Sequence, residues 1–256
     1  MNISIATIKV LIGITIFAFF ATLPLSYFQT NCNSWALFWC NAIMIGLFAS
    51  SFVVLLCEWV RYWHQKSDAE GKMYGYSLLL FSQLSDMHVK INNVLDNPQA
   101  PLHPTFLQPS IEHIVEYINQ ISIVDYSTFC NNNELQLSFA LFLQNGIMQL
   151  RNYVSTAQSV EMAIQEDRKD ILVTNLDSLN KFKEGKNNSY VERADTVTSN
   201  SPKTNAALEN TKKEMEPLLA SVESLIKNIT KECKNNFDWK KDKERIMEII
   251  RTANNE

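Results

Sequence analysis

Two long apolar runs open the chain, Val10 to Phe28 and Trp35 to Cys57, with a short polar bridge between them. Neither run contains a charged residue. At about 1.5 Å of rise per residue, each run forms a helix long enough to cross a hydrocarbon core of about 30 Å. The pattern therefore predicts a transmembrane hairpin over residues 1–66, with spans at about 10–28 and 35–57.

The charged residues that flank the runs predict the orientation of this hairpin. Lys9 precedes the first run, Arg61 and Lys66 follow the second, and the bridge between the runs has neither Lys nor Arg. Because cytoplasmic flanks are enriched in basic residues, both termini are expected in the cytoplasm. The expected location is the inner (plasma) membrane, with the lipid bilayer as a partner of this multi-pass chain.

Small residues recur along one face of the second span. Ala42, Gly46 and Ser50 are spaced by four, which lets another backbone approach closely. The partner in this packing is either the first span of the same chain or the second span of another copy. Asn41 is the most polar side chain of the span, and it is expected either to hydrogen-bond between helices or to line a polar passage in an oligomer.

The segment after the membrane carries a heptad stripe. Its apolar members follow steps of four, three, four and three, and they are Leu80, Leu84, Met87, Ile91 and Val94. A helix is predicted from a cap at Asp68 to about Leu95. Gly71 and Gly75 lie between the membrane exit and the stripe, and they predict a hinge there.

Helical patterns continue through the rest of the chain. Residues 67–184 are predicted to form a cytoplasmic helical domain, with helices starting at Pro109 and Glu134 and a possible break at 165–170. Residues 185–204 are rich in Asn, Ser and Thr and predict a flexible linker.

The C-terminal segment, residues 205–256, is also predicted to be helical. Its first helix has Pro217 in the first turn and a second heptad stripe, formed by Leu218, Val222, Leu225 and Ile229. A short last helix runs from Trp239 to Arg251. The predicted fold class is therefore all-α, a transmembrane hairpin followed by a helical bundle or coiled-coil domain. Each heptad stripe either fills the core of that domain or mediates self-association.

Residues that could carry chemistry do not form a recognisable site. The four histidines show no metal-ligand spacing, the five cysteines form no Cys-x-x-Cys motif, and no phosphate-binding or nucleophile motif is present. No enzymatic activity, metal or cofactor is expected. The net charge of -4 argues against binding to nucleic acid. A disulfide between Cys32 and Cys40 requires an oxidising compartment, and the sequence leaves it open.

Two functions fit this organisation. The first is a membrane effector of defence or toxin type, whose spans oligomerise and perturb the inner membrane under control of the cytoplasmic helices. The layout is similar to that of bacterial two-span defence effectors, which depolarise or breach that membrane; the similarity covers the hairpin and the first tail helix and includes no shared motif. The second is a membrane-tethered scaffold or sensor subunit that recruits a protein partner through its cytoplasmic helices. A channel subunit is a weaker third idea, since neither span holds a carboxylate at its middle.

Overall fold

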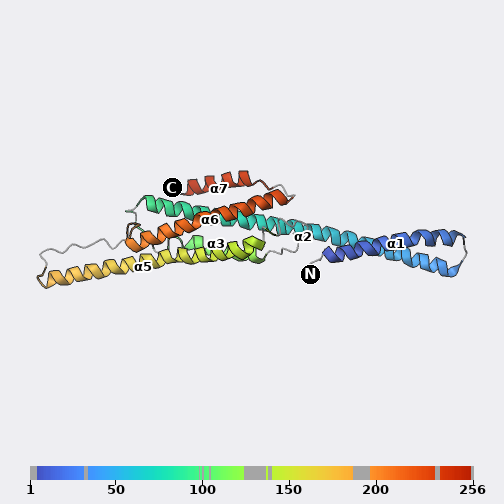
Figure 1. The fold of residues 1–256 in the computed structure, drawn as a ribbon, viewed down its shortest axis with the longest axis horizontal. Coiled ribbons are helices and arrows are strands. Elements are labelled where there is room, and N and C mark those ends of the chain that lie inside the picture. Colours follow the sequence, from blue (N-terminus) through green and yellow to red (C-terminus); the bar gives the residue numbers. More distant parts are fainter. Residues whose placement is uncertain are drawn as a thin grey trace. The chain divides into compact units, whose positions relative to one another are not determined.

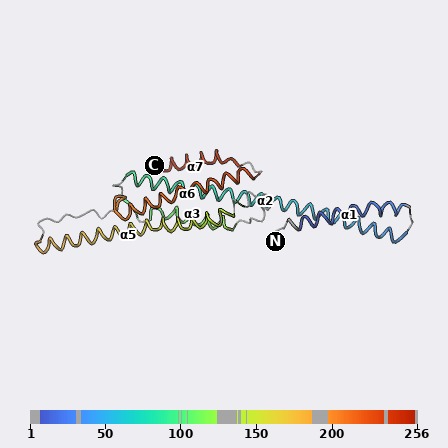
Figure 2. The backbone as a smooth tube through the Cα atoms, viewed as in Figure 1, coloured from blue at the N-terminus to red at the C-terminus, as the bar shows by residue number. Residues whose placement is uncertain are grey.

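The computed structural model describes residues 5–31, 34–97, 99, 101–103, 105–123, 137, 140–186, 197–233 and 237–254. Within these ranges regular structure is helical, apart from an isolated bridge between Pro101 and Thr198. The all-α class predicted from the sequence is therefore confirmed for the described residues. The elements in chain order are α1 (Ile5–Asn31), α2 (Trp35–Asp96), α3 (Gln108–Ile123), the π-helical turn η2 (Phe142–Gly146), α5 (Ile147–Lys183), α6 (Pro202–Glu232) and α7 (Trp239–Ala253), shown in Figures 1 and 2.

The chain divides into two compact units. The first contains α1 and α2 up to Ala69, and the second contains α2 from Glu70 onward with α3, η2, α5, α6 and α7. Most of the predicted domain 67–184 therefore belongs to the same unit as the predicted C-terminal segment 205–256. The sequence alone separated them because the polar composition of residues 185–204 hides the packing of the helices on either side.

In the first unit, α1 and the start of α2 pack along a narrow seam and leave most of their apolar surface outside. Ala18 is fully buried, whereas the Phe17 and Phe20 side chains are 70% and 63% exposed. Pro24 lies inside α1, which continues through it to Asn31. Both helices are long and apolar enough to cross a membrane.

The second unit has a continuous apolar core. Side chains of α2, α3, α5 and α6 contribute to it, and α5 packs beside α6 (Figure 1). The two heptad stripes lie in this core: Leu80, Leu84, Met87 and Ile91 have no exposed surface, and Leu218, Val222, Leu225 and Ile229 are at most 4% exposed. Val94, the last member of the first stripe, is half-buried. Because burial of apolar surface is the main favourable term in folding, these stripes hold the unit together.

One buried carboxylate joins α5 to the start of α6. Asp167 is 4% exposed, and its Oδ2 accepts hydrogen bonds from the Thr204 backbone N at 2.8 Å and from Thr204 Oγ1 at 2.7 Å. The first N–H groups of a helix lack partners within the helix and attract negative charge. Asp167 therefore acts on α6 as a capping residue supplied by another helix.

Helix boundaries differ from the sequence prediction where local signals were weak. The predicted cap at Asp68 is wrong, since α2 is helical through Asp68, Gly71 and Gly75. The predicted break at 165–170 is also absent, because α5 is continuous from Ile147 to Lys183. A glycine inside a helix lowers stability by about 1 kcal/mol relative to alanine. The burial of neighbouring apolar side chains contributes more stability than this.

Residues 197–204, the last part of the predicted linker, pack against the helices. Val197 and Ser199 are buried, the Leu102 backbone N donates to the Val197 carbonyl at 2.9 Å, and α6 already begins at Pro202. Pro217 consequently lies inside α6 and not in its first turn, where Pro202 stands instead. An interior proline costs about 3 kcal/mol, and α6 tolerates it because buried residues flank it on the same helix. The predicted helix start at Glu134 and residues 187–196 of the linker lie outside the described residues.

Candidate functional site: the apolar helix pair and the contact of α7 with α2

Polar side chains connect α1 and α2 at two levels of the helix pair. In the middle, the Thr15 Oγ1 donates to the Ser51 Oγ at 3.2 Å. Nearer the bridge, the Asn41 side-chain amide donates to the Gln29 Oε1 at 2.6 Å and accepts from the Ser26 hydroxyl at 3.4 Å. Hydrogen bonds of this kind contribute about 0.6–2 kcal/mol each when the surroundings are lipid.

The Asn41 side chain therefore hydrogen-bonds between α1 and α2 of one chain. This is the first of the two roles that the sequence left open for it. Gln29 and Ser26 were not predicted as its partners, because their distance from Asn41 along the sequence depends on how the bridge turns. Burial at the same seam extends to Thr15 and Ser51, which are 7% and 9% exposed.

The small-residue face of α2 is not used against α1. Ala42, Gly46 and Ser50 are all exposed, and they lie on a different side of the helix from the buried Asn41 and Ser51. A Cβ atom added at Gly46 would meet nothing within 4 Å. The sequence left two partners open for this face, the first span of the same chain and the second span of another copy. In the structure, the first span of the same chain does not occupy it.

The predicted hinge residues lie within the continuous α2 helix. Gly71 and Gly75 are both helical, and a Cβ atom added at either would meet nothing within 4 Å. Close packing therefore does not explain the two glycines. Bending of α2 at these positions remains a prediction.

α7 packs against α2 shortly after these glycines. The Tyr74 ring stacks on the Phe237 ring with centroids 4.2 Å apart, and the Tyr74 hydroxyl donates to the Asp242 Oδ2 at 2.7 Å. About two helical turns further on, the Phe81 and Trp239 rings meet edge to face with centroids 4.9 Å apart. These contacts join residues about 160 positions apart, so no local sequence pattern predicts them.

Charged groups complete the contact of α7 with its neighbours. The Lys243 Nζ lies 2.9 Å from the Glu223 Oε1 of α6 and within 6 Å of the Phe81 and Trp239 ring centroids. Lys227 also pairs with Glu223, at 3.0 Å. Partial burial alone would raise the pKa of Glu223, but the hydrogen bonds from Lys243 and Lys227 outweigh it and hold the pKa below its ordinary value.

The Tyr74 hydroxyl keeps its proton and donates a hydrogen bond to the Asp242 carboxylate. Burial first, and then the hydrogen bond and negative charge of Asp242, raise the pKa of the Tyr74 hydroxyl far above its ordinary value. The phenol therefore stays neutral, and the contact with Asp242 persists as a charge-assisted hydrogen bond.

Replacing Tyr74 with Phe tests this contact. Tyr74→Phe keeps the ring stacked on Phe237 but removes the donor to Asp242, so we expect a loss of about 1–2 kcal/mol in the docking of α7. Limited proteolysis between α6 and α7 should become several-fold faster. An unchanged cleavage rate would show that the stacked rings alone hold α7; Tyr76→Phe, a neighbouring tyrosine with no hydrogen bond described to α7, is the matched control.

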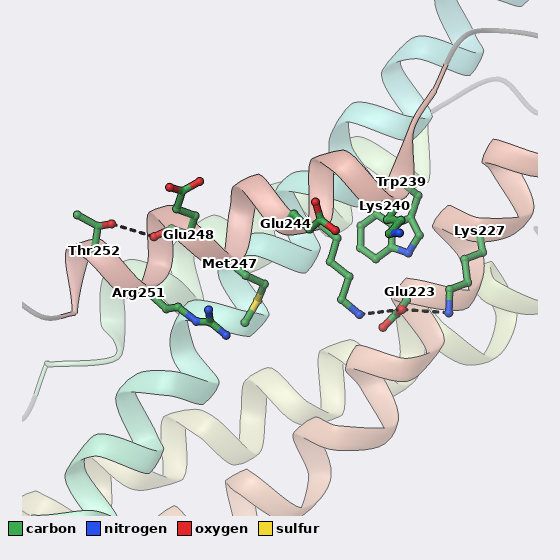
Figure 3. A pocket seen from close by; sticks show the side chains of 10 residues that line it. Glu223, Lys227, Trp239, Lys240, Glu244, Met247, Glu248, Arg251 and Thr252 are labelled. Carbon is green, nitrogen blue, oxygen red and sulfur yellow. Dashed lines mark hydrogen bonds and ion pairs between the residues drawn. The ribbon is translucent and has the colours of Figure 1, made fainter.

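A groove of about 860 Å³ lies between α6 and α7. Figure 3 shows Met247 and Arg251 of α7 pointing into it, beside the Lys243–Glu223–Lys227 ion pairs. Both lysines and glutamates line the groove, so its charges favour neither an anionic nor a cationic ligand. Among the described residues there is also no group of three or more His, Cys, Asp or Glu side chains that could hold a metal ion.

Cysteines add no further site within the described residues. Cys40 and Cys57 are free thiols, Cys233 is buried, and Cys32 and Cys130 lie outside the described residues. Comparison with protein-family models, with curated proteins and with solved structures found no match.

Proposed function

We propose that the protein is a membrane-anchored, non-enzymatic effector whose α1 and first part of α2 form a transmembrane hairpin. The observation that carries the proposal is the apolar outer surface of this helix pair, where the Phe17, Phe20 and Ile43 side chains are at least 61% exposed. Apolar side chains of this size, exposed in such density, are stable only when lipid or protein covers them. The inner membrane is the proposed location, with both termini in the cytoplasm because Lys9 and Arg61 flank the helices.

Oligomerisation of the spans is the proposed effector step. The exposed face of Ala42, Gly46 and Ser50 allows close approach of a second helix, and α1 leaves it open. Copies that pack through this face would bring several hairpins together in the bilayer and perturb it.

Control by the cytoplasmic helices is proposed to act through α2. Tyr74 and Phe81, which contact α7, belong to the same continuous helix as the small-residue face. A ligand or partner that binds one arrangement of α7 better than another would shift the population of α2 conformations by its difference in affinity.

Gly46→Ile tests the effector step. Its side chain fits the single chain, since nothing lies within 4 Å of the added Cβ, but it would block close approach of a second helix. We expect expression of the wild type to depolarise the inner membrane and slow growth, and Gly46→Ile to abolish both effects. The measurement is a potential-sensitive dye together with growth after induction.

Gly13→Ile in α1 is the matched control for this test. It makes the same change of size at another exposed glycine with nothing within 4 Å, away from the small-residue face of α2. Equal effects of the two variants, or depolarisation that survives Gly46→Ile, would contradict the proposal.

A tethered scaffold is the second candidate function. The complete core of the second unit favours it, because a domain that folds around its own stripes can present its outer surface to a protein partner. Expression of the full chain and of a chain truncated after Gln65 separates the two functions. If neither changes the membrane potential or growth, the scaffold is the better account.

A further inference from the structure

The apolar side chains of α7 are only partly covered by the rest of the protein. Trp239 and Ile250 are 8% and 4% exposed, whereas Ile249 is 58% exposed. Ile246 and Met247 are half-buried. The neighbouring helices therefore bury part of the apolar surface of α7 and leave the rest in water.

The residues of α7 are arranged as in a helix that lies in a membrane surface. At 3.6 residues per turn, successive side chains are rotated by about 100°, and most of the apolar ones then fall within one arc of about 100°. The members of this apolar arc are Trp239, Ile246, Ile249, Ile250 and Ala253. Glu244 and Glu248 lie opposite the arc. Figure 3 shows the Glu248 side chain pointing away from Glu223 of α6.

Basic side chains lie on both sides of these two glutamates. Lys240 and Arg251 lie toward one border of the apolar arc. Lys241 and Arg245 lie toward the other border, and all four are exposed. Long basic side chains in such places keep their stems along apolar surface while their charges reach outward. In a helix that lies in a bilayer surface, these charges meet lipid phosphates and the glutamates face water.

The net charge of α7 also favours an anionic surface. The helix carries five basic and three acidic side chains. In the docked position Lys243 pairs at 2.9 Å with Glu223, which belongs to α6 and would stay behind if α7 were released. The released helix would therefore be positively charged, and each basic side chain near anionic lipid strengthens its attraction to the bilayer.

Asp242 favours the docked position of α7. It lies within the apolar arc, and the Tyr74 hydroxyl donates a hydrogen bond to its Oδ2 at 2.7 Å. Burial of a carboxylate without such a partner is unfavourable. Because Asp242 stands in the first turn beside Trp239, a lipid-bound α7 would keep it at the level of the headgroups, where tryptophan also settles.

We propose that α7 exchanges between its docked position on α2 and the anionic lipid surface of the membrane that holds the hairpin. The two positions exclude each other, because Trp239 and Ile250, which are buried in the docked position, belong to the arc that would enter lipid. The inference rests on the proposed function, since the hairpin keeps α7 close to a bilayer and raises its effective concentration there. Anionic phospholipid is then the ligand that shifts the arrangement of α7.

Quenching by labelled lipid tests the proposal on the full-length chain. The five native cysteines are replaced by alanine, and a fluorophore is attached to Ala253→Cys in the apolar arc. The chain is reconstituted in vesicles of phosphatidylcholine alone, or of phosphatidylcholine and phosphatidylglycerol in equal parts, with a nitroxide on the lipid acyl chains. We expect strong quenching in the anionic vesicles and weak quenching in the neutral ones. A fluorophore on Glu248→Cys, at the opposite side of α7, should be quenched less in the anionic vesicles.

Charge variants measure the contribution of the basic borders. Lys241→Gln with Arg245→Gln should lower the ratio of lipid-bound to docked α7 about 10–30-fold, because two charges no longer meet lipid headgroups. Lys181→Gln with Lys183→Gln is the matched control: it removes the same charge from two exposed lysines at the end of α5 and should leave the ratio unchanged.

Two further variants separate lipid contact from docking. Ile249→Gln removes an exposed apolar side chain from the arc and should lower the ratio about tenfold. Tyr74→Phe weakens docking without changing α7 itself, so it should raise the ratio several-fold.

Three results would overturn the proposal. The first is equal quenching at Ala253 in anionic and neutral vesicles, and the second is equal loss of quenching in the two double variants. The third is quenching that Tyr74→Phe leaves unchanged, since docking and lipid contact would then not compete. Flotation with neutral vesicles reports the hairpin separately. A chain that does not float with them contradicts the proposed anchoring, whereas a chain that floats but shows no quenching at Ala253 in anionic vesicles contradicts only the exchange of α7.

Discussion

Leu84→Ala should lower the free energy of unfolding of the second unit by about 3 kcal/mol, within a range of about 2–5 kcal/mol. Leu84 has no exposed surface and is the second member of the first heptad stripe. Truncation removes buried methyl groups and leaves a cavity that neighbouring helices cannot fully close. Urea unfolding of the full-length protein in detergent, followed by circular dichroism, measures the change.

Leu79→Ala is the matched control on the same helix. Leu79 is 44% exposed, so the same substitution should cost less than about 1 kcal/mol. If Leu84→Ala instead left stability unchanged and altered only the assembly state, the stripe would be an interface between copies and its assignment to the core would be wrong.

Asp167→Ala should cost about 2–3 kcal/mol, the second large effect. The substitution leaves the backbone N–H and the hydroxyl of Thr204 buried without their acceptor, and it removes a negative charge from the start of α6. Hydrogen exchange measured by mass spectrometry should show faster exchange in the first turns of α6, and urea unfolding should give the free-energy change.

Asp170→Ala, three residues along α5, serves as the control for Asp167→Ala. Asp170 pairs with Lys203 at 3.0 Å, but its side chain is 66% exposed, and surface ion pairs contribute only about 0–1 kcal/mol. Similar losses in both variants would mean that the charge near α6, and not the buried hydrogen bonds, dominates.

Periodic apolar patterns in the sequence predicted which residues form the core and which helices are long and apolar. The stripe residues Leu80, Leu84, Met87, Ile91, Leu218, Val222, Leu225 and Ile229 are buried in the structure, and both apolar runs are helical. Periodicity works here because burial of several large side chains on one face contributes more than any single local preference.

Glycine and proline residues, which disfavour helix locally, led to wrong predictions of helix ends. Gly71, Gly75 and Pro217 lie inside helices because their costs, about 1–3 kcal/mol, are smaller than the packing energy around them. The contacts of Asp167 with Thr204 and of Tyr74 with Asp242 could not be predicted at all. Each joins residues far apart in the chain, so it depends on how the helices fold together.

The candidate site was predictable only in part. Gly46 and its small neighbours could be found from their spacing, but the side of α2 that meets α1 depends on which polar groups pair across the seam.

The pairing of Phe81 with Trp239 has a consequence for biosynthesis. At about 5–20 residues per second, a ribosome adds Trp239 about 8–30 s after Phe81. During that interval the newly made stripe on α2 has no α7 and no complete α6 to cover it. Nascent chains should therefore depend on a chaperone during translation, and stalled or truncated products should aggregate.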